Sequence, residues 1–301
     1  MRYYLAPMEG VTTWIYRKAH AMVYGPLDKY FIPFVEPHEK RDFKKKELDE
    51  IAPEHNEGYY AVPQILTNKA DGFIKLAKAL QKLGYQEINL NVGCPSKTVT
   101  AKGKGAGFLE HPEELDHFLE EIFSQLDVKL SVKTRAGMYE PEEFEHLLEI
   151  YNKYPMEELI LHPRVGADFY KNVPRLEVYR DAKKKSRNPL CYNGDLFVPR
   201  YVERFFEEFP EEDRVMIGRG IIVNPGLAAG QYDKRLFWDF HEQVYQMYLE
   251  KDMGDIHTLY RMKELWFYQV HNFPDAEKYA KKFRKARKLS DYEAVIREMM
   301  R

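Results

Sequence analysis

A single cysteine lies where a polar-faced strand is expected to end, in the segment INLNVGCPSK (residues 88–97). Apolar residues alternate there with Asn89 and Asn91, which is typical of a strand whose two faces have different surroundings. Cys94 stands directly before Pro95, which removes a backbone donor and restricts Cys94 to an extended conformation. Taken alone, Cys94 is either a buried structural thiol or a functional one, and its neighbours must decide.

Chemically active side chains follow several other apolar runs. These are Pro7, Met8 and Glu9, then Gln64, Lys133, Arg135, His162 and Arg164, and then Asn193, Gly194, Asp195, Gly218 and Arg219. Lysine is almost never fully buried without a partner, so we expect an anion near Lys133. The segment GRGIIVNPG (218–226) joins a glycine-rich turn to a short helix, which is the usual phosphate site of a barrel. Together these features predict a phosphorylated cofactor.

Each of these residues also has a structural alternative. Gln64 is more often a satisfied polar side chain, Lys133 can be a strand-end charge, and His162 a satisfied histidine. The pair Asn193-Gly194 is a common turn signal, and Cys191, inside an apolar run, is expected in the core. Convergence favours function, because strand ends that are scattered along a sequence meet at one mouth in a barrel.

Eight short apolar or β-branched runs alternate with helical patterns. The expected strands cover residues 3–7, 29–34, 61–66, 87–92, 129–134, 158–163, 189–194 and 214–219. This alternation predicts an α/β fold, a (β/α)8 TIM barrel. The alternative is an open doubly wound sheet. No dinucleotide-type glycine fingerprint follows the first strand and polar residues end most strands, which favours the barrel.

The strand pattern stops near residue 230. Four helical patterns follow, at residues 235–252, 255–273, 275–288 and 290–301. We therefore expect a catalytic barrel over residues 1–230 and a small all-helical domain over residues 231–301. The stretch KYAKKFRKARK (278–288) contains seven Lys and Arg residues and no acid. A solvated helix face is the alternative to phosphate contact there.

Composition limits the classes of function. The net charge of the 301 residues is −2, so any nucleic-acid contact needs a local basic patch. No apolar run is long enough for a membrane span and the N-terminus lacks a signal peptide's apolar core. The two cysteines, Cys94 and Cys191, form no CxxC pair. We therefore expect a cytoplasmic protein without a disulfide framework or a metal site.

Six segments resemble the tRNA-dihydrouridine synthases, flavin enzymes that reduce the C5–C6 double bond of specific uridines in tRNA. They cover the expected barrel in the family's order, and the N-x-G-C-P segment with its Lys/Gly-rich loop is the most specific. The segments are APMEGVT (6–12), NLNVGCPSKTVTAKGKGAGFL (89–109), VKTRAG (132–137), LHPR (161–164), NGD (193–195) and IGRG (217–220). Pro163 departs from the glycine that is more frequent in the family, and residues 165–179 match only loosely.

The resemblance implies FMN as cofactor and NADPH as a reductant that binds transiently at the same mouth. Lys133 would stabilise the reduced flavin ring and Cys94 would donate a proton to the uracil. For that role the pKa of Cys94 must not be strongly depressed. The residues that the resemblance places around the cofactor are Pro7, Met8, Glu9, Gln64, Asn91, Lys133, His162, Asn193, Gly194, Asp195, Gly218 and Arg219.

The resemblance also implies a tRNA substrate, which the helical domain would bind, and we expect a monomer. We expect the loop over residues 96–108 to be a mobile lid that touches phosphate. The residues predicted to contact tRNA are Arg135, Lys97, Lys102, Lys104, Lys281, Lys282, Arg284 and Lys285.

Two other functions share part of this pattern. One is an FMN-dependent barrel reductase of a small molecule, which does not need a basic helical domain. The other is a non-catalytic tRNA-binding barrel protein, which does not need Cys94 and Lys133.

Overall fold

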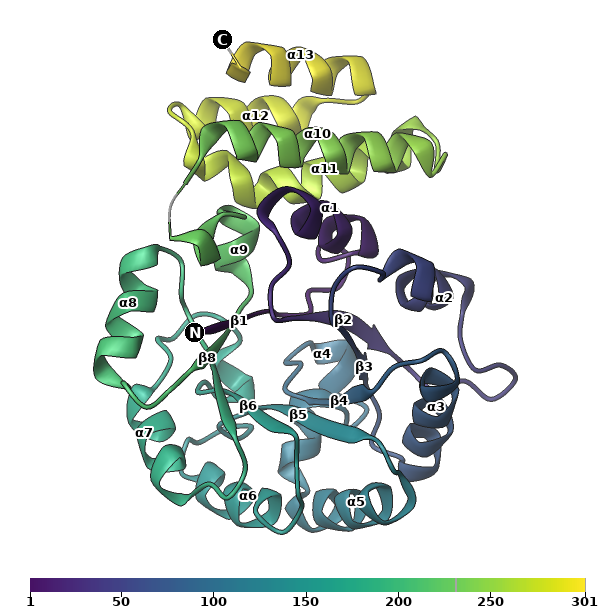
Figure 1. Ribbon diagram of the computed structural model, residues 1–301, viewed down its shortest axis with the longest axis vertical. Coiled ribbons are helices and arrows are strands. Elements are labelled where there is room, and N and C mark those ends of the chain that lie inside the picture. Colours follow the sequence, from purple (N-terminus) through teal and green to yellow (C-terminus); the bar gives the residue numbers. More distant parts are fainter. Residues whose placement is uncertain (231, 301) are drawn as a thin grey trace.

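The structure, a computed structural model, describes residues 1–230 and 232–300. Eight parallel strands form a closed barrel in the order β1 to β8, in which β1 also pairs with β8 (Figure 1). Every expected strand is confirmed, and closure excludes the open sheet. The strands are β1 Arg2–Leu5, β2 Lys29–Val35, β3 Ala61–Ile65, β4 Glu87–Val92, β5 Lys129–Arg135, β6 Glu158–His162, β7 Leu190–Asn193 and β8 Arg214–Ile217.

Helices follow each strand and cover the outside of the barrel. The apolar face of α3 is buried at Phe73, Leu76 and Leu80, as its spacing predicts. The polar stretch after β2 forms α2 and the short turn η1. The helices are α1 Trp14–Tyr24, α2 Lys45–Ile51, α3 Ala70–Lys82, α4 Lys97–Thr100, α5 Pro112–Gln125, α6 Glu143–Tyr151, α7 Leu176–Lys185, α8 Pro199–Glu208 and α9 Arg219–Val223, and the 3-10 turns are η1 Pro53–His55, η2 Gly105–Glu110, η3 Gly166–Asp168 and η4 Leu227–Ala229.

A layer of charge forms the floor of the barrel. The first residues of the even-numbered strands are Lys29, Glu87, Glu158 and Arg214. Side chains of alternate strands share a layer in such barrels, and here Lys29 Nζ lies 2.7 Å from Glu87 Oε2 and 3.3 Å from Glu158 Oε2. Arg214 Nη1 lies 2.7 Å from the other oxygen of Glu158. Two cations and two anions thus neutralise one another below the core.

The barrel interior above this floor is apolar on one side and polar on the other. Its apolar cluster includes Phe31, Ile160, Cys191 and Met216, so the expectation that Cys191 is a core residue is confirmed. Strands β3, β4 and β5 instead contribute buried amide and hydroxyl groups, which are described with the site.

Four further helices pack together on one side of the barrel, next to α1 and α9 (Figure 1). They are α10 Lys234–Glu250, α11 Asp255–Gln269, α12 Ala276–Lys285 and α13 Leu289–Met300, and the turn η5 Val270–Asn272 follows α11. Trp266 is buried among their aromatic rings and stacks on Phe283 at 4.7 Å. The ring of Phe240 meets Tyr16 of α1 edge-on at 5.1 Å. These helices confirm the expected C-terminal helical segment, although residues 231 and 301, which the expected domain includes, lie outside the described residues.

Candidate active site

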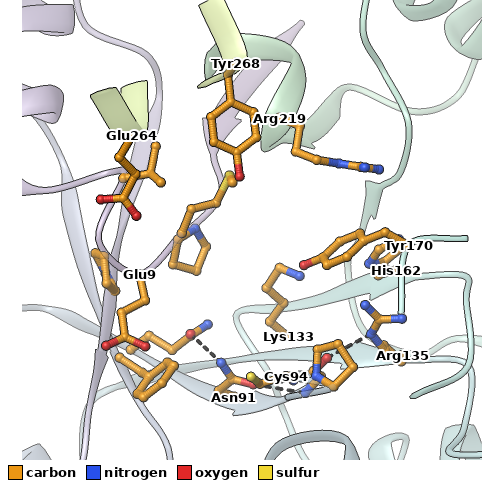
Figure 2. A pocket seen from close by; sticks show the side chains of 18 of the residues that line it. Glu9, Asn91, Cys94, Lys133, Arg135, His162, Tyr170, Arg219, Glu264 and Tyr268 are labelled. Carbon is orange, nitrogen blue, oxygen red and sulfur yellow. Dashed lines mark hydrogen bonds between the residues drawn. The ribbon is translucent and has the colours of Figure 1, made fainter. Parts of the chain in front are cut away.

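A cavity of about 480 Å³ opens at the C-terminal ends of the strands (Figure 2). This volume is typical of a small-molecule or cofactor site. Ten of the residues predicted for the site line it, although they come from six strands or strand ends. They are Pro7, Met8, Glu9, Gln64, Asn91, Cys94, Lys133, Arg135, His162 and Arg219.

A chain of hydrogen bonds between side chains connects the barrel interior to the loop that carries the cysteine. Asn91 Nδ2 donates to Gln64 Oε1 at 2.7 Å. Gln64 Nε2 then donates to Asn89 Oδ1 at 2.7 Å, and Asn89 Nδ2 donates to Ser131 Oγ at 2.9 Å. All four side chains are buried. The chain fixes which end of the Gln64 amide is the oxygen and leaves it one free donor and one free lone pair.

The peptide groups around Cys94 are held from three sides. Asn91 Oδ1 accepts from the backbone N–H groups of Gly93 at 3.0 Å and of Cys94 at 2.9 Å. Arg135 Nε donates to the carbonyl oxygen of Gly93 at 2.9 Å, and Ala106 N donates to that of Cys94 at 2.9 Å. The cysteine therefore has a fixed backbone at the cavity wall.

The thiol of Cys94 is held in its protonated form. Burial raises the pKa of Cys94, and the nearby Glu9 carboxylate adds to this, while Arg135 and Lys133 oppose it. A raised pKa suits a proton donor and does not suit a thiolate nucleophile. The direction agrees with the expectation from the sequence.

The cavity carries positive charge on its β5 and β6 side. Figure 2 shows the ammonium of Lys133 pointing into the cavity. Burial, with a contribution from Arg135, lowers the pKa of Lys133 to about 8. Burial also lowers the pKa of His162 well below its usual value. Arg164 Nη1 lies 3.0 Å from His162 Nε2 and can only donate, so His162 is neutral with its proton on Nδ1.

An aromatic ring lies between two arginines at the same side of the cavity. The guanidinium carbons of Arg135 and Arg219 lie 5.4 Å and 4.7 Å from the ring centre of Tyr170. Asp168 holds this loop, because its carboxylate accepts from the backbone N–H of Val165 at 3.0 Å. Tyr170 belongs to the segment for which the sequence suggested no function.

Four residues predicted to surround the cofactor are not part of the cavity wall. Asp195 accepts from Arg219 at 2.7 Å and from Arg164 at 2.6 Å. Asn193 Nδ2 donates to the carbonyl oxygen of Met216 at 2.8 Å. A Cβ atom on Gly194 would lie 2.0 Å from Tyr192 Oη. These three, with Gly218, form the framework beside the cavity.

The predicted lid is compact. Residues 97–100 form α4 and residues 105–110 form η2, and a Cβ atom on Gly107 would lie 2.6 Å from the carbonyl oxygen of Thr100. Lys97 and Lys102 are exposed, whereas Lys104 pairs with Glu36 at 2.9 Å.

The basic residues of α12 differ in their exposure and in their ion pairs. Lys281, Arg284 and Lys285 are exposed. Lys282 instead pairs with Glu298 of α13, which also accepts Lys278 at 2.9 Å. One carboxylate therefore offsets part of the charge that the sequence places on this helix.

Several residues of the cavity wall were not predicted. Glu264, Phe267 and Tyr268 come from α11, outside the barrel, and Pro33 and Phe34 come from the end of β2. The spacing of the α11 residues places them on one helix face.

In the described residues, no helix is long and apolar enough to cross a membrane, and no group of three or more His, Cys, Asp or Glu side chains is arranged to hold a metal ion.

The sequence comparisons agree on one family. A sequence model described as dihydrouridine synthase matches residues 4–300. The chain is 30% identical over 137 residues to tRNA-dihydrouridine synthase B of Vibrio vulnificus, and the aligned segment covers 45% of this chain and 42% of that protein. It is 30% identical over 232 residues to a Staphylococcus aureus protein named "Probable tRNA-dihydrouridine synthase", covering 73% and 68%. The chain therefore spans only part of each relative's length.

Solved structures share the barrel. The old yellow enzyme homologue of Zymomonas mobilis superposes with a TM-score of 0.55 at 13% identity, covering 79% of this chain and 92% of that chain. At this identity the likeness shows the fold alone.

Proposed function

This chain belongs to the dihydrouridine synthase family, and on that premise we propose that it is an FMN- and NADPH-dependent oxidoreductase that reduces a uridine of tRNA to 5,6-dihydrouridine. The observation that carries the proposal is the meeting of Cys94, Lys133 and Gln64 in one cavity. Their types supply a proton donor, a cation and an oriented amide, which are the groups that this reduction needs.

The chemistry of the cavity wall fits the ring of a flavin. The free donor and lone pair of Gln64 suit the pyrimidine edge of the ring, which has alternating acceptors and donors. Lys133 beside them suits the negative charge of the reduced ring. Pro7 and Met8 offer an apolar surface at the same cavity. Arg219, which lines the wall and is held by Asp195, would be the cation that binds the phosphate.

When bound, FMN supplies the hydride that adds to C6 of the uracil, and NADPH is the reductant that renews it. The protein's own task is then at C5, where the enolate left by this addition must receive a proton. The protonated thiol of Cys94 provides it. The bonds of Asn91, Arg135 and Ala106 to the neighbouring peptides keep Cys94 in place while the base enters.

The uridine must leave its stack to reach this cavity, which costs a few kcal/mol and least in a loose loop. We infer that exposed basic residues outside the mouth bind the RNA backbone. Lys97 and Lys102 are exposed on the loop that follows Cys94, and Lys281, Arg284 and Lys285 are exposed on α12. The buried Arg135 contributes by holding Gly93 in place.

The test maps dihydrouridine position by position in tRNA from cells that lack the gene and express either the native chain or Cys94→Ala. We expect one or a few sites to depend on the gene and only the native chain to restore them. Cys191→Ala is the matched control, because this second cysteine lies in the barrel core. Restoration by Cys94→Ala would refute the role of the thiol, and unchanged sites would favour a reductase of a small molecule.

A further inference from the structure

The mouth of the cavity is completed by α11, which does not belong to the barrel. Glu264, Phe267 and Tyr268 of this helix line the cavity together with the strand ends. Arg261 Nη1 donates to the carbonyl oxygen of Gly10 at 3.0 Å and lies 3.1 Å from Glu264 Oε2. Gly10 follows directly on the residues of the β1 loop that line the cavity, so α11 has a fixed position over the mouth.

Phe267 is far more exposed than Trp266, the residue directly before it on the helix. Its exposed fraction is 72%, whereas that of Trp266 is 1%. The ring of Tyr268 meets Phe267 edge-on, with ring centres 5.1 Å apart and planes at 88°. Two aromatic rings at right angles thus stand at the rim. Two adjacent aromatic rings that line a cavity and are open to solvent on one side offer a contact surface to a ligand.

The charges beside these rings indicate what the contact is. Figure 2 shows Glu264 and Glu9 on the same side of the cavity, below and beside Tyr268. The exposed fractions of these two carboxylate side chains are 43% and 63%. Each has one cation beside it, Arg261 at 3.1 Å from Glu264 and Lys46 at 3.7 Å from Glu9, so this side of the mouth offers a phosphate group no excess of positive charge. A nucleobase suits them better, because it offers a ring face to Phe267 and N–H donors to a carboxylate.

We propose that Phe267 and Tyr268 form a stacking surface for a base of the RNA strand next to the extruded uridine. This inference rests on the proposed function. Extrusion of one base leaves its neighbour with an uncovered ring face, and proteins that bind single-stranded or looped RNA cover such faces with aromatic side chains. Because α11 is fixed to the β1 loop, the surface lies at a set distance from the reacting base.

Steady-state kinetics of the FMN-loaded protein with tRNA test the proposal. We expect Phe267→Ala to raise KM for tRNA about 5-fold or more, with a smaller effect on kcat, since stacking on one aromatic ring is commonly worth that much. Phe267→Tyr should keep most of the affinity. The matched control is Tyr260→Ala, because Tyr260 is an aromatic residue of the same helix with an exposed fraction of 61% that lies outside the cavity wall.

The outcomes separate stacking from other causes. An unchanged KM in Phe267→Ala overturns the proposal. Full recovery by Phe267→Leu overturns it too, because an apolar contact without a ring would then suffice. An equal loss in Tyr260→Ala points to a general surface effect and overturns it as well. If the native protein forms no dihydrouridine, the proposed function fails, and equilibrium binding of tRNA to the same variants still tests the stacking surface.

Discussion

The buried hydrogen-bonded side chains Ser131, Asn89, Gln64 and Asn91 can be tested by replacing two of them, Asn89 and Ser131, alone and together. Asn89→Leu has nearly the same size and leaves Gln64 Nε2 without its acceptor and Ser131 Oγ without its donor. Ser131→Ala leaves one proton of Asn89 Nδ2 without an acceptor. The two changes share one hydrogen bond, so their effects must be coupled.

The size of each effect follows from the number of polar groups left unpaired. A buried group without a partner costs about 1–3 kcal/mol, and Asn89 and Ser131 are both fully buried. Asn89→Leu should therefore lower the free energy of unfolding by about 2–6 kcal/mol and Ser131→Ala by about 1–3 kcal/mol. The double variant lacks the Ser131 oxygen that Asn89→Leu leaves unpaired. Adding Ser131→Ala to Asn89→Leu should therefore leave the free energy of unfolding unchanged or raise it.

Urea unfolding of the four proteins measures this coupling, and titration of the apo proteins with FMN measures its consequence for the site. We expect weaker FMN binding in Asn89→Leu, because the Gln64 amide loses the partner that orients it. The reasoning is refuted if the two single losses add in the double variant to within about 0.5 kcal/mol.

Two further predictions concern charge. Lys29→Met leaves Glu87 and Glu158 buried without their shared cation and should lower the free energy of unfolding by about 3–5 kcal/mol at pH 8. Burial raises the pKa of Glu87, and Lys29 opposes this rise. Protonated Glu87 therefore contributes stability to the folded protein at low pH, and this contribution is lost as pH rises through the folded-state pKa. The loss of stability in the variant should be smaller at pH 5 than at pH 8, and equal losses at the two pH values would contradict this. Because the pKa of Lys133 is about 8 and its cation is the useful form, the rate of flavin reduction by NADPH without RNA should fall as pH rises through about 8. Lys133→Met should be slow at every pH, and a native rate that stays constant from pH 7 to 9.5 would contradict the role of Lys133.

The fold could be predicted because it depends on local patterns. Eight apolar runs alternate with helical periodicity, and once a barrel is assumed, its topology brings the strand ends to one mouth. This explains why Gln64, Lys133 and His162 were placed together correctly although they are far apart in the sequence. The prediction needed no knowledge of side-chain contacts.

The contacts that depend on register could not be predicted. Gln64 faces Asn89 and Asn89 faces Ser131 across neighbouring strands, and no local pattern fixes that alignment. The partner of Lys282 is Glu298, on another helix, so the basic stretch by itself does not reveal that part of its charge is offset. On α11 the run Trp266-Phe267-Tyr268 did carry a signal, because three successive aromatic residues cannot all face the core of one helix.

Asn91 connects the Gln64 amide to the backbone of Cys94, and its residue type explains how. Its amide nitrogen donates to Gln64, which faces the proposed flavin, and its oxygen accepts from the backbone of Cys94, which carries the proposed proton donor. A carboxylate could not donate to Gln64, and an apolar residue could do neither. A single side chain thus contacts both the amide that faces the proposed cofactor and the backbone that carries the thiol. A change to Gln64 or Asn89 therefore has a hydrogen-bonded route to the backbone of Cys94.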